Sequence, residues 1–178
     1  MPEHLTEWPT LILAGAFVCS VIYYLIRRRI DPVRKVPHEY FSRLWLWPPG
    51  SHARWEAEVD IALAGANKKV GFHSATTHQD VMAEGPTDAE VRFCKQHMAN
   101  LSGLFRLTKP AVDEAWKDWV KGEMPEDWTT VLSLDGFSVP KDGNAKEPWG
   151  VTWFCHPAGH FFSIEFREGE PVLASVDG

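Results

Sequence analysis

Side chains that could ligate a metal or act in catalysis gather in one short segment, Cys155-His156-Pro157-Ala158-Gly159-His160. Thiolate and imidazole are good ligands for Zn²⁺, and a fold could add His73 or His78. A structural zinc site usually has four ligands at recognisable spacings, and the spacing here is not diagnostic. We therefore predict neither a metal nor another cofactor, and we expect His160 to anchor the backbone of the Pro-Ala-Gly turn.

Three carboxylates are predicted to share one face of a strand. Residues 55–63 alternate apolar and mostly acidic positions with a period of two, which is typical of a half-exposed strand. Glu56, Glu58 and Asp60 then project from the same face. Such a stripe could serve acid–base chemistry or bind a cation, and it also protects an edge hairpin from aggregation. We expect a solvated face that can dock a basic protein.

Tryptophan is abundant, with nine among the 22 aromatic residues. Most tryptophans belong to protein cores, but an exposed one is a favoured anchor of protein interfaces. We take Trp116 and Trp119, on one predicted helix, as candidate binding residues together with the three carboxylates. The sequence contains no GxSxG, HExxH, Walker or GxGxxG motif, so we predict no catalytic residues and favour a non-enzymatic role.

The elements that must position these residues follow from periodicity. Thr87 and Glu90 form a capping box before an apolar stripe that runs to Phe105, and a second helix is predicted from Thr108 to Gly122. Strands are predicted over residues 55–63, 70–74, 131–139, 149–155, 160–167 and 172–176. Short connections favour an α+β fold in which a mostly antiparallel sheet packs against two helices, and the helices are expected to form a hairpin.

An apolar run precedes this domain. Residues 8–26 carry no charge and would span about 28 Å as a helix, close to the roughly 30 Å hydrocarbon core of a bilayer. We predict a transmembrane helix. Aromatic residues at its ends and arginines after it would anchor it at the interfaces: Trp8, Tyr23, Tyr24, Arg27, Arg28 and Arg29.

Five basic residues follow the run within nine positions and none precedes it, so the C-terminal side is predicted to be cytoplasmic. The expected organisation is a tail and transmembrane helix over residues 1–29, a juxtamembrane connector over 30–51 and one globular α+β domain over 52–178. The predicted location is the bacterial inner membrane, with the lipid bilayer as one partner.

The domain itself is acidic. From Val36 onward the chain has 21 acidic and 13 basic residues, a net charge of −8. Nucleic acid repels such a domain, whereas a basic protein attracts it. We therefore predict a basic protein partner and no nucleic acid. Cys94 and Cys155 could be two buried thiols or one disulfide.

Three short segments of residues 128–178 carry a resemblance: Leu134-Asp135-Gly136-Phe137-Ser138-Val139, then Gly159-His160 followed by Phe161-Phe162-Ser163-Ile164, and finally Val176-Asp177-Gly178. With them, this third of the chain resembles small bacterial immunity-like domains of unknown function that are associated with polymorphic toxins. The resemblance implies an immunity-like or accessory binding role and transfers no catalytic residues.

Together these observations predict a non-enzymatic, membrane-anchored protein-binding module. Its two specific forms are an immunity protein that neutralises a toxin and an accessory subunit of a membrane complex. The alternative is a membrane-tethered hydrolase or metal-dependent enzyme that uses Cys155, His156 and His160.

Overall fold

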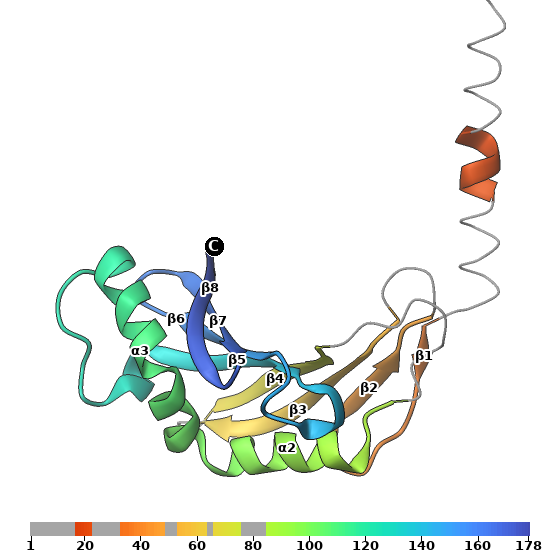
Figure 1. Cartoon of the computed structure of the whole chain (residues 1–178), viewed down its shortest axis with the longest axis horizontal. Coiled ribbons are helices and arrows are strands. Elements are labelled where there is room, and N and C mark those ends of the chain that lie inside the picture. The colour runs from red at the N-terminus through yellow and green to blue at the C-terminus, as the bar shows by residue number, and fades with distance from the viewer. Residues whose placement is uncertain (1–16, 23–32, 49–52, 64–65, 76–84) are drawn as a thin grey trace, which may run out of the picture. The chain divides into compact units, whose positions relative to one another are not determined.

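The computed structural model describes residues 17–22, 33–48, 53–63, 66–75 and 85–178. The chain divides into two units, Met1–Val33 and Arg34–Gly178. The second unit is the α+β domain, and the description below concerns it alone unless stated otherwise (Figure 1).

The domain is built from one eight-stranded sheet, two α-helices and two short 3₁₀ helices. The helices are α2 (Asp88–Ala99), α3 (Leu101–Trp119), η1 (Trp128–Thr130) and η2 (Lys141–Gly143). The strands are β1 (Arg34–Lys35), β2 (Arg43–Leu46), β3 (Trp55–Leu63), β4 (Ala66–Ser74), β5 (Leu132–Val139), β6 (Trp149–Cys155), β7 (His160–Arg167) and β8 (Glu170–Asp177).

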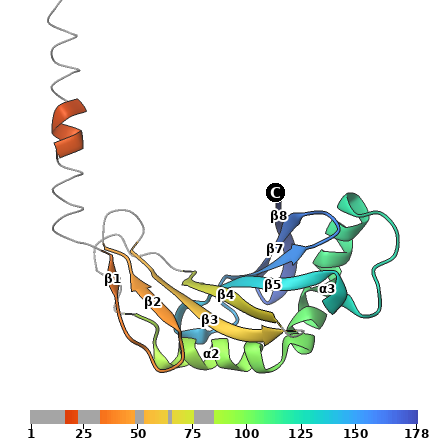
Figure 2. The same ribbon diagram turned by 180° about the vertical axis from the view of Figure 1, so that it is seen from behind.

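The strands follow one another across the sheet in sequence order, and all neighbours are antiparallel except β4 and β5. A parallel pair needs a crossover connection, which α2 and α3 supply. Figure 1 and the reverse view in Figure 2 show α2 running beneath the β2–β4 part of the sheet. In both views α3 turns away from α2 to lie beside the β5–β8 part.

One face of the sheet is apolar because apolar residues of neighbouring strands lie opposite one another on it. Phe72, Phe137, Val151 and Ile164 sit opposite one another on four successive strands, and all are at least 98% buried. Both helices pack on this face: Phe93 of α2 meets Trp149 edge-on, and Phe105 of α3 meets Trp153 in the same way. The hydrophobic core therefore lies between the sheet and the two helices.

The opposite face carries small and charged residues. The row beside Phe72 and Phe137 begins with Gly71 opposite Gly136 and continues through Thr152 and Ser163. A Cβ on Gly136 would lie 2.9 Å from the carbonyl oxygen of Gly71, so only glycine permits this approach of β5 to β4.

The helix boundaries differ from those predicted. The predicted start at Thr108 is wrong: Pro110 lies inside α3, on its exposed side, and the break between the helices falls at Asn100. The Asn100 backbone is non-helical, its N–H donates to the carbonyl of His97, and its side chain accepts from the N–H of Gly103 at 3.0 Å. The same residue thus ends α2 and begins α3. The helices join end to end rather than as a hairpin.

The predicted single-pass membrane protein is contradicted. Of the predicted span, only residues 17–22 are described, and these residues are helical. Across the described part of the chain, no helix is long and apolar enough to cross a membrane. The predictions of a transmembrane helix and of an inner-membrane location are therefore wrong. The proposed anchor residues Trp8, Tyr23, Tyr24, Arg27, Arg28 and Arg29 lie outside the described residues.

The predicted connector over residues 30–51 contains two strands of the sheet. β1 pairs with β2, and β2 pairs with β3 through Leu44 opposite Ala57. Phe41, Leu44 and Leu46 are 3 to 5% exposed and belong to the core. This segment therefore begins the folded domain.

A buried carboxylate joins three elements of the domain. Glu90, 7% exposed, accepts from the backbone N–H of Thr87 at 2.8 Å, from the Trp55 indole at 3.3 Å and from the backbone N–H of Asp142 at 3.3 Å. The Thr87 hydroxyl accepts from the N–H of Glu90 in return, which completes the predicted capping box. Glu90 therefore links the start of α2 to β3 and to η2.

We predict that Glu90→Ala lowers the free energy of unfolding by about 2–4 kcal/mol, because it removes the acceptor of three donors, one of them a buried indole. Glu90→Gln keeps one accepting oxygen and should cost less. Urea unfolding followed by circular dichroism measures both. Glu114→Ala, on the exposed side of α3, is the control and should stay within about 0.5 kcal/mol of the wild type. Equal stability of Glu90→Ala and the control would contradict the prediction.

A second buried polar contact fixes α3 on the sheet. Thr108 is fully buried, and its hydroxyl donates to the carbonyl of Phe105 at 3.1 Å while it accepts from the Trp153 indole at 3.0 Å. Trp153 is also fully buried, so its indole N–H cannot donate to water. The Thr108 hydroxyl takes the place of water as the acceptor of that N–H.

Thr108→Val keeps the shape of the side chain but leaves the Trp153 indole without an acceptor. We expect a loss of about 1–3 kcal/mol in unfolding free energy. Thr108→Ser retains the hydroxyl and should preserve the near-ultraviolet circular dichroism of the buried indole, which Thr108→Val should alter. An unchanged spectrum and stability in Thr108→Val would show that this hydrogen bond is unimportant.

Candidate functional site

Two of the three carboxylates in the predicted acidic stripe on β3, Glu56 and Glu58, are ion-paired, whereas Asp60 is exposed and makes no ion pair with the described residues. Glu58 lies 3.5 Å from Arg43 of β2 and 3.2 Å from Lys69 of β4. Glu56 accepts from Arg54 at 2.7 Å. The Arg43–Glu58 pair follows from cross-strand register, because the two residues sit opposite each other. The stripe projects from the face that the helices leave uncovered, and basic neighbours balance the charge of Glu56 and Glu58 there.

His73 of β4 lies opposite Glu56 on the same uncovered face. Burial lowers its pKa, the nearby Arg54 guanidinium lowers it further, and Glu56 acts in the opposite direction. The net effect of these three influences is a lowered pKa for His73.

The two candidate tryptophans of α3 have different environments. Trp116 is 4% exposed and belongs to the core, where its indole N–H has no hydrogen-bond partner among the described residues. Trp119, one helical turn later, is 49% exposed. The structure therefore separates the pair: Trp116 has a structural role, and Trp119 is available to a partner. Neither lies on the face of the sheet that carries Glu56, Glu58 and Asp60.

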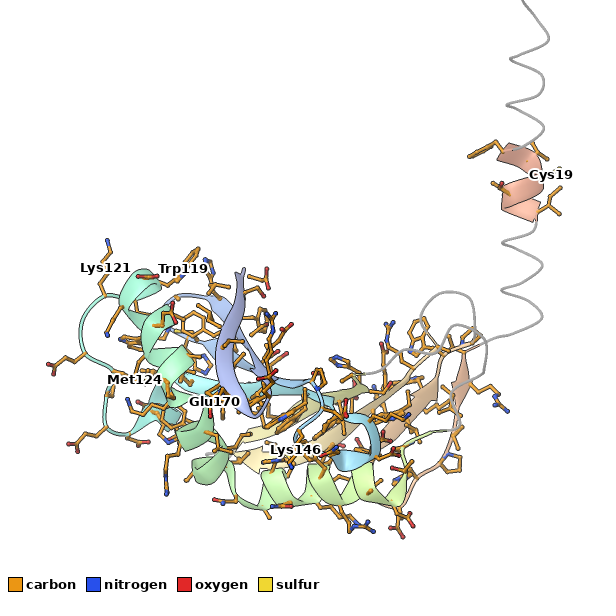
Figure 3. All side chains as sticks on the ribbon, in the orientation of Figure 1. Cys19, Trp119, Lys121, Met124, Lys146 and Glu170 are labelled. Atoms are coloured by element: carbon orange, nitrogen blue, oxygen red, sulfur yellow. The ribbon has the colours of Figure 1, made fainter. Side chains whose placement is uncertain are left out.

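Trp119 is held at the end of α3 by its surroundings. Its ring meets the ring of His160 edge-on, with centroids 4.8 Å apart. The helix stops directly afterwards, because Lys121 and Gly122 both adopt positive φ angles. The backbone of Gly178 covers the other side of His160, since a Cβ there would lie 2.0 Å from Nδ1. Figure 3 shows Trp119 and Lys121 together at this end of α3.

The cysteine–histidine segment does not form a reactive group. Cys155 is fully buried, and burial raises the pKa of its thiol, although a backbone hydrogen bond from Ala158 acts in the opposite direction. His156 is exposed and packs edge-on against Phe154, whereas His160 packs against Trp119. Cys94 is likewise a free, buried thiol whose pKa is raised to about 12, mainly by burial.

Histidine, cysteine and carboxylate side chains do not converge on a metal position. Among the described residues no group of three or more could hold an ion. The turn after Cys155 is closed by its own backbone, through a hydrogen bond from Gly159 N–H to the Cys155 carbonyl at 2.9 Å. His160 therefore contributes an aromatic contact to α3 rather than the expected anchor for this turn.

A shallow cavity of about 320 Å³ lies where α2 meets α3. The ring of His97 and the side chains of Leu104 and Leu107 supply its apolar wall, and Asn100 and Arg106 are also in the lining. The His97 ring stacks on Trp149 at 5.2 Å, and burial lowers its pKa.

The carboxylates near Trp119 differ from those on β3. Residues 113–127, which we call the acidic segment, contain six carboxylates and two lysines. Lys109 binds Asp113 at 2.6 Å, and Asp127 accepts from the Thr129 N–H. The other four, Glu114, Asp118, Glu123 and Glu126, are exposed, and within the described residues none lies in an ion pair.

The contact between Trp119 and His160 joins residues 41 positions apart, and the sequence analysis missed it. The only sequence signal was that both residues stand at the ends of predicted elements.

Comparisons of the chain with protein-family models, with curated proteins and with solved structures find no match. The resemblance to immunity-like domains therefore stays a prediction.

The two histidines with lowered pKa values make stability depend on pH. In the unfolded chain His73 and His97 titrate near 6.5, whereas in the folded domain their pKa values lie lower. Their contribution is fully present above about pH 6.5 and is lost as the pH falls towards the folded pKa values, because the unfolded state then binds more protons. Urea unfolding should give a lower unfolding free energy at pH 5 than at pH 7.5. His97→Gln should reduce this difference, and an unchanged difference would contradict the assignment.

Proposed function

We propose that this domain is a non-enzymatic protein-binding module and that Trp119 is the anchor of its interface. The observation that carries the proposal is a large aromatic side chain, 49% exposed and held by His160 at the end of a well-packed helix. A tryptophan held in this way offers a large contact area, and little side-chain entropy is lost when it binds.

The surroundings of Trp119 support this proposal. Its helix is fixed to the sheet through Thr108 and Trp153, so the anchor is presented on a rigid element. An immunity protein that neutralises a toxin and an accessory subunit of a larger complex both act through such a surface. The resemblance of residues 128–178 favours the first form, and it includes His160, the residue that contacts Trp119.

Catalysis receives no comparable support. The side chains named for the alternative, those of Cys155, His156 and His160, point to separate neighbours, and the buried thiol of Cys155 has a raised pKa. A thiol in that state is a poor nucleophile, because the thiolate is the reactive form.

Photocrosslinking tests the proposed anchor. Trp119 is replaced in the full chain by p-benzoylphenylalanine, the native cells are irradiated, and covalent adducts are identified by mass spectrometry. We expect one dominant protein adduct. Leu107 is the matched control, because it lies on the same helix and is 50% exposed. The same replacement at Leu107 should give no such adduct.

A second measurement uses the partner identified in this way. Trp119→Ala should weaken its binding by at least about tenfold, which corresponds to an interface anchor, whereas Leu107→Ala should leave the affinity unchanged. Both variants should melt within a few degrees of the wild type, because both side chains are half exposed. Equal crosslinking at both positions, or full affinity of Trp119→Ala, would overturn the proposal.

A further inference from the structure

We infer that the partner is a basic protein segment and that it binds the surface formed by Trp119 and the acidic segment, residues 113–127. This inference rests on the proposed function and adds the chemistry of the partner to it. A basic partner is attracted most strongly by carboxylates that are not already paired with a basic residue of the domain.

The distribution of ion pairs separates two acidic regions. On β3, Arg43 and Lys69 flank Glu58, and Arg54 holds Glu56. Only Asp60 of that stripe makes no ion pair with the described residues. A basic partner at that face would have to displace these pairs. In the acidic segment, Glu114, Asp118, Glu123 and Glu126 are exposed and make no ion pair with the described residues. Lys117 and Lys121 offset this charge only in part, so the segment stays net negative. A basic partner therefore gains attraction there without breaking an existing ion pair.

Asp118 occupies an electrostatically unfavourable position on α3. Asp118 is the next-to-last residue of the helix, where the partial negative charge of the helix end disfavours a carboxylate. Glu114 stands one turn before it on the same exposed side. The helix therefore gains nothing from the carboxylate of Asp118, which remains free to attract a cation.

Trp119 and the carboxylates near it in the chain are suited to bind the same basic side chain. Asp118 precedes Trp119 directly, and Glu123 follows it after the sharp end of the helix at Lys121 and Gly122. An arginine of a partner can stack on an indole face and bind a neighbouring carboxylate at the same time. Arginine-rich segments are thus the partner chemistry that this surface fits best.

A peptide titration tests the inference on the full chain. Hexa-arginine is the probe, and hexacitrulline, which has a similar shape and no charge, is its control. Binding is followed through the indole N–H resonance of Trp119 in a ¹⁵N spectrum at low salt, assigned with Trp119→Phe. We expect hexa-arginine, and not hexacitrulline, to shift this resonance, and the affinity should fall as salt is raised.

Two triple variants with the same change in net charge locate the binding. Glu114→Gln with Asp118→Asn and Glu123→Gln should weaken hexa-arginine binding by about fivefold or more. Glu56→Gln with Glu58→Gln and Asp60→Asn, on β3, should change it by less than about twofold. Circular dichroism and thermal unfolding confirm that both variants fold.

Equal weakening by the two triple variants would overturn the inference, because binding would then reflect net charge alone. An acidic partner crosslinked at position 119 would also overturn it and would leave the proposed function intact. Conversely, equal crosslinking at positions 107 and 119 would reject the proposed function, whatever the peptide titration shows.

Discussion

The arrangement of the domain depends on one buried carboxylate. Glu90 accepts from the backbone of Thr87, from the Trp55 indole and from the backbone of Asp142, so the first turn of α2, the strand β3 and the 3₁₀ helix η2 share a single acceptor group. The contact requires η2 to approach α2 very closely. A Cβ on Gly143, whose φ is +64°, would lie 2.5 Å from the carbonyl oxygen of Ala89, so glycine is required there. A buried carboxylate is stable only when its oxygens are hydrogen-bonded, and here three donors from distant parts of the chain do this.

The position of Trp119 follows from this arrangement through a series of packed contacts. Once α2 is placed, Phe93 and His97 lie on Trp149, and Asn100 turns the chain into α3. Thr108 then binds Trp153, which fixes α3 against strand β6. The helix continues past Pro110 because this residue faces solvent, where the carbonyl that loses its hydrogen bond can be hydrated. Trp119 is consequently held by the fold and does not depend on a loop for its position.

The sequence predicted well those elements that depend only on a short local pattern of residues. The capping box at Thr87 and the strand Trp149–Cys155 agree with the prediction because each depends on neighbouring residues. The helix boundary at Asn100 was missed because an apolar stripe continues across it, and Pro110 gave a stronger local signal. The transmembrane prediction for residues 8–26 rested on the absence of charge and on the flanking aromatic and basic residues, and no helix of the described residues is long and apolar enough to cross a membrane. The candidate site was predicted in part: Trp119 was selected, but its separation from the buried Trp116 depends on tertiary packing.

Carboxylates of the same chemical type have three different roles in this domain, and only their surroundings distinguish them. Glu90 is buried and organises the core, whereas Glu56 and Glu58 are half exposed and bind neighbouring basic residues of the sheet. Four carboxylates of the acidic segment, those of Glu114, Asp118, Glu123 and Glu126, have neither kind of partner in the described part of the chain. For Asp118, in the last turn of α3, the unfavourable end of the helix dipole costs about 0.3–1 kcal/mol at low salt. A cost of this size is small beside the contribution of Glu90, so the fold can keep uncompensated charge next to an exposed tryptophan without losing its structure.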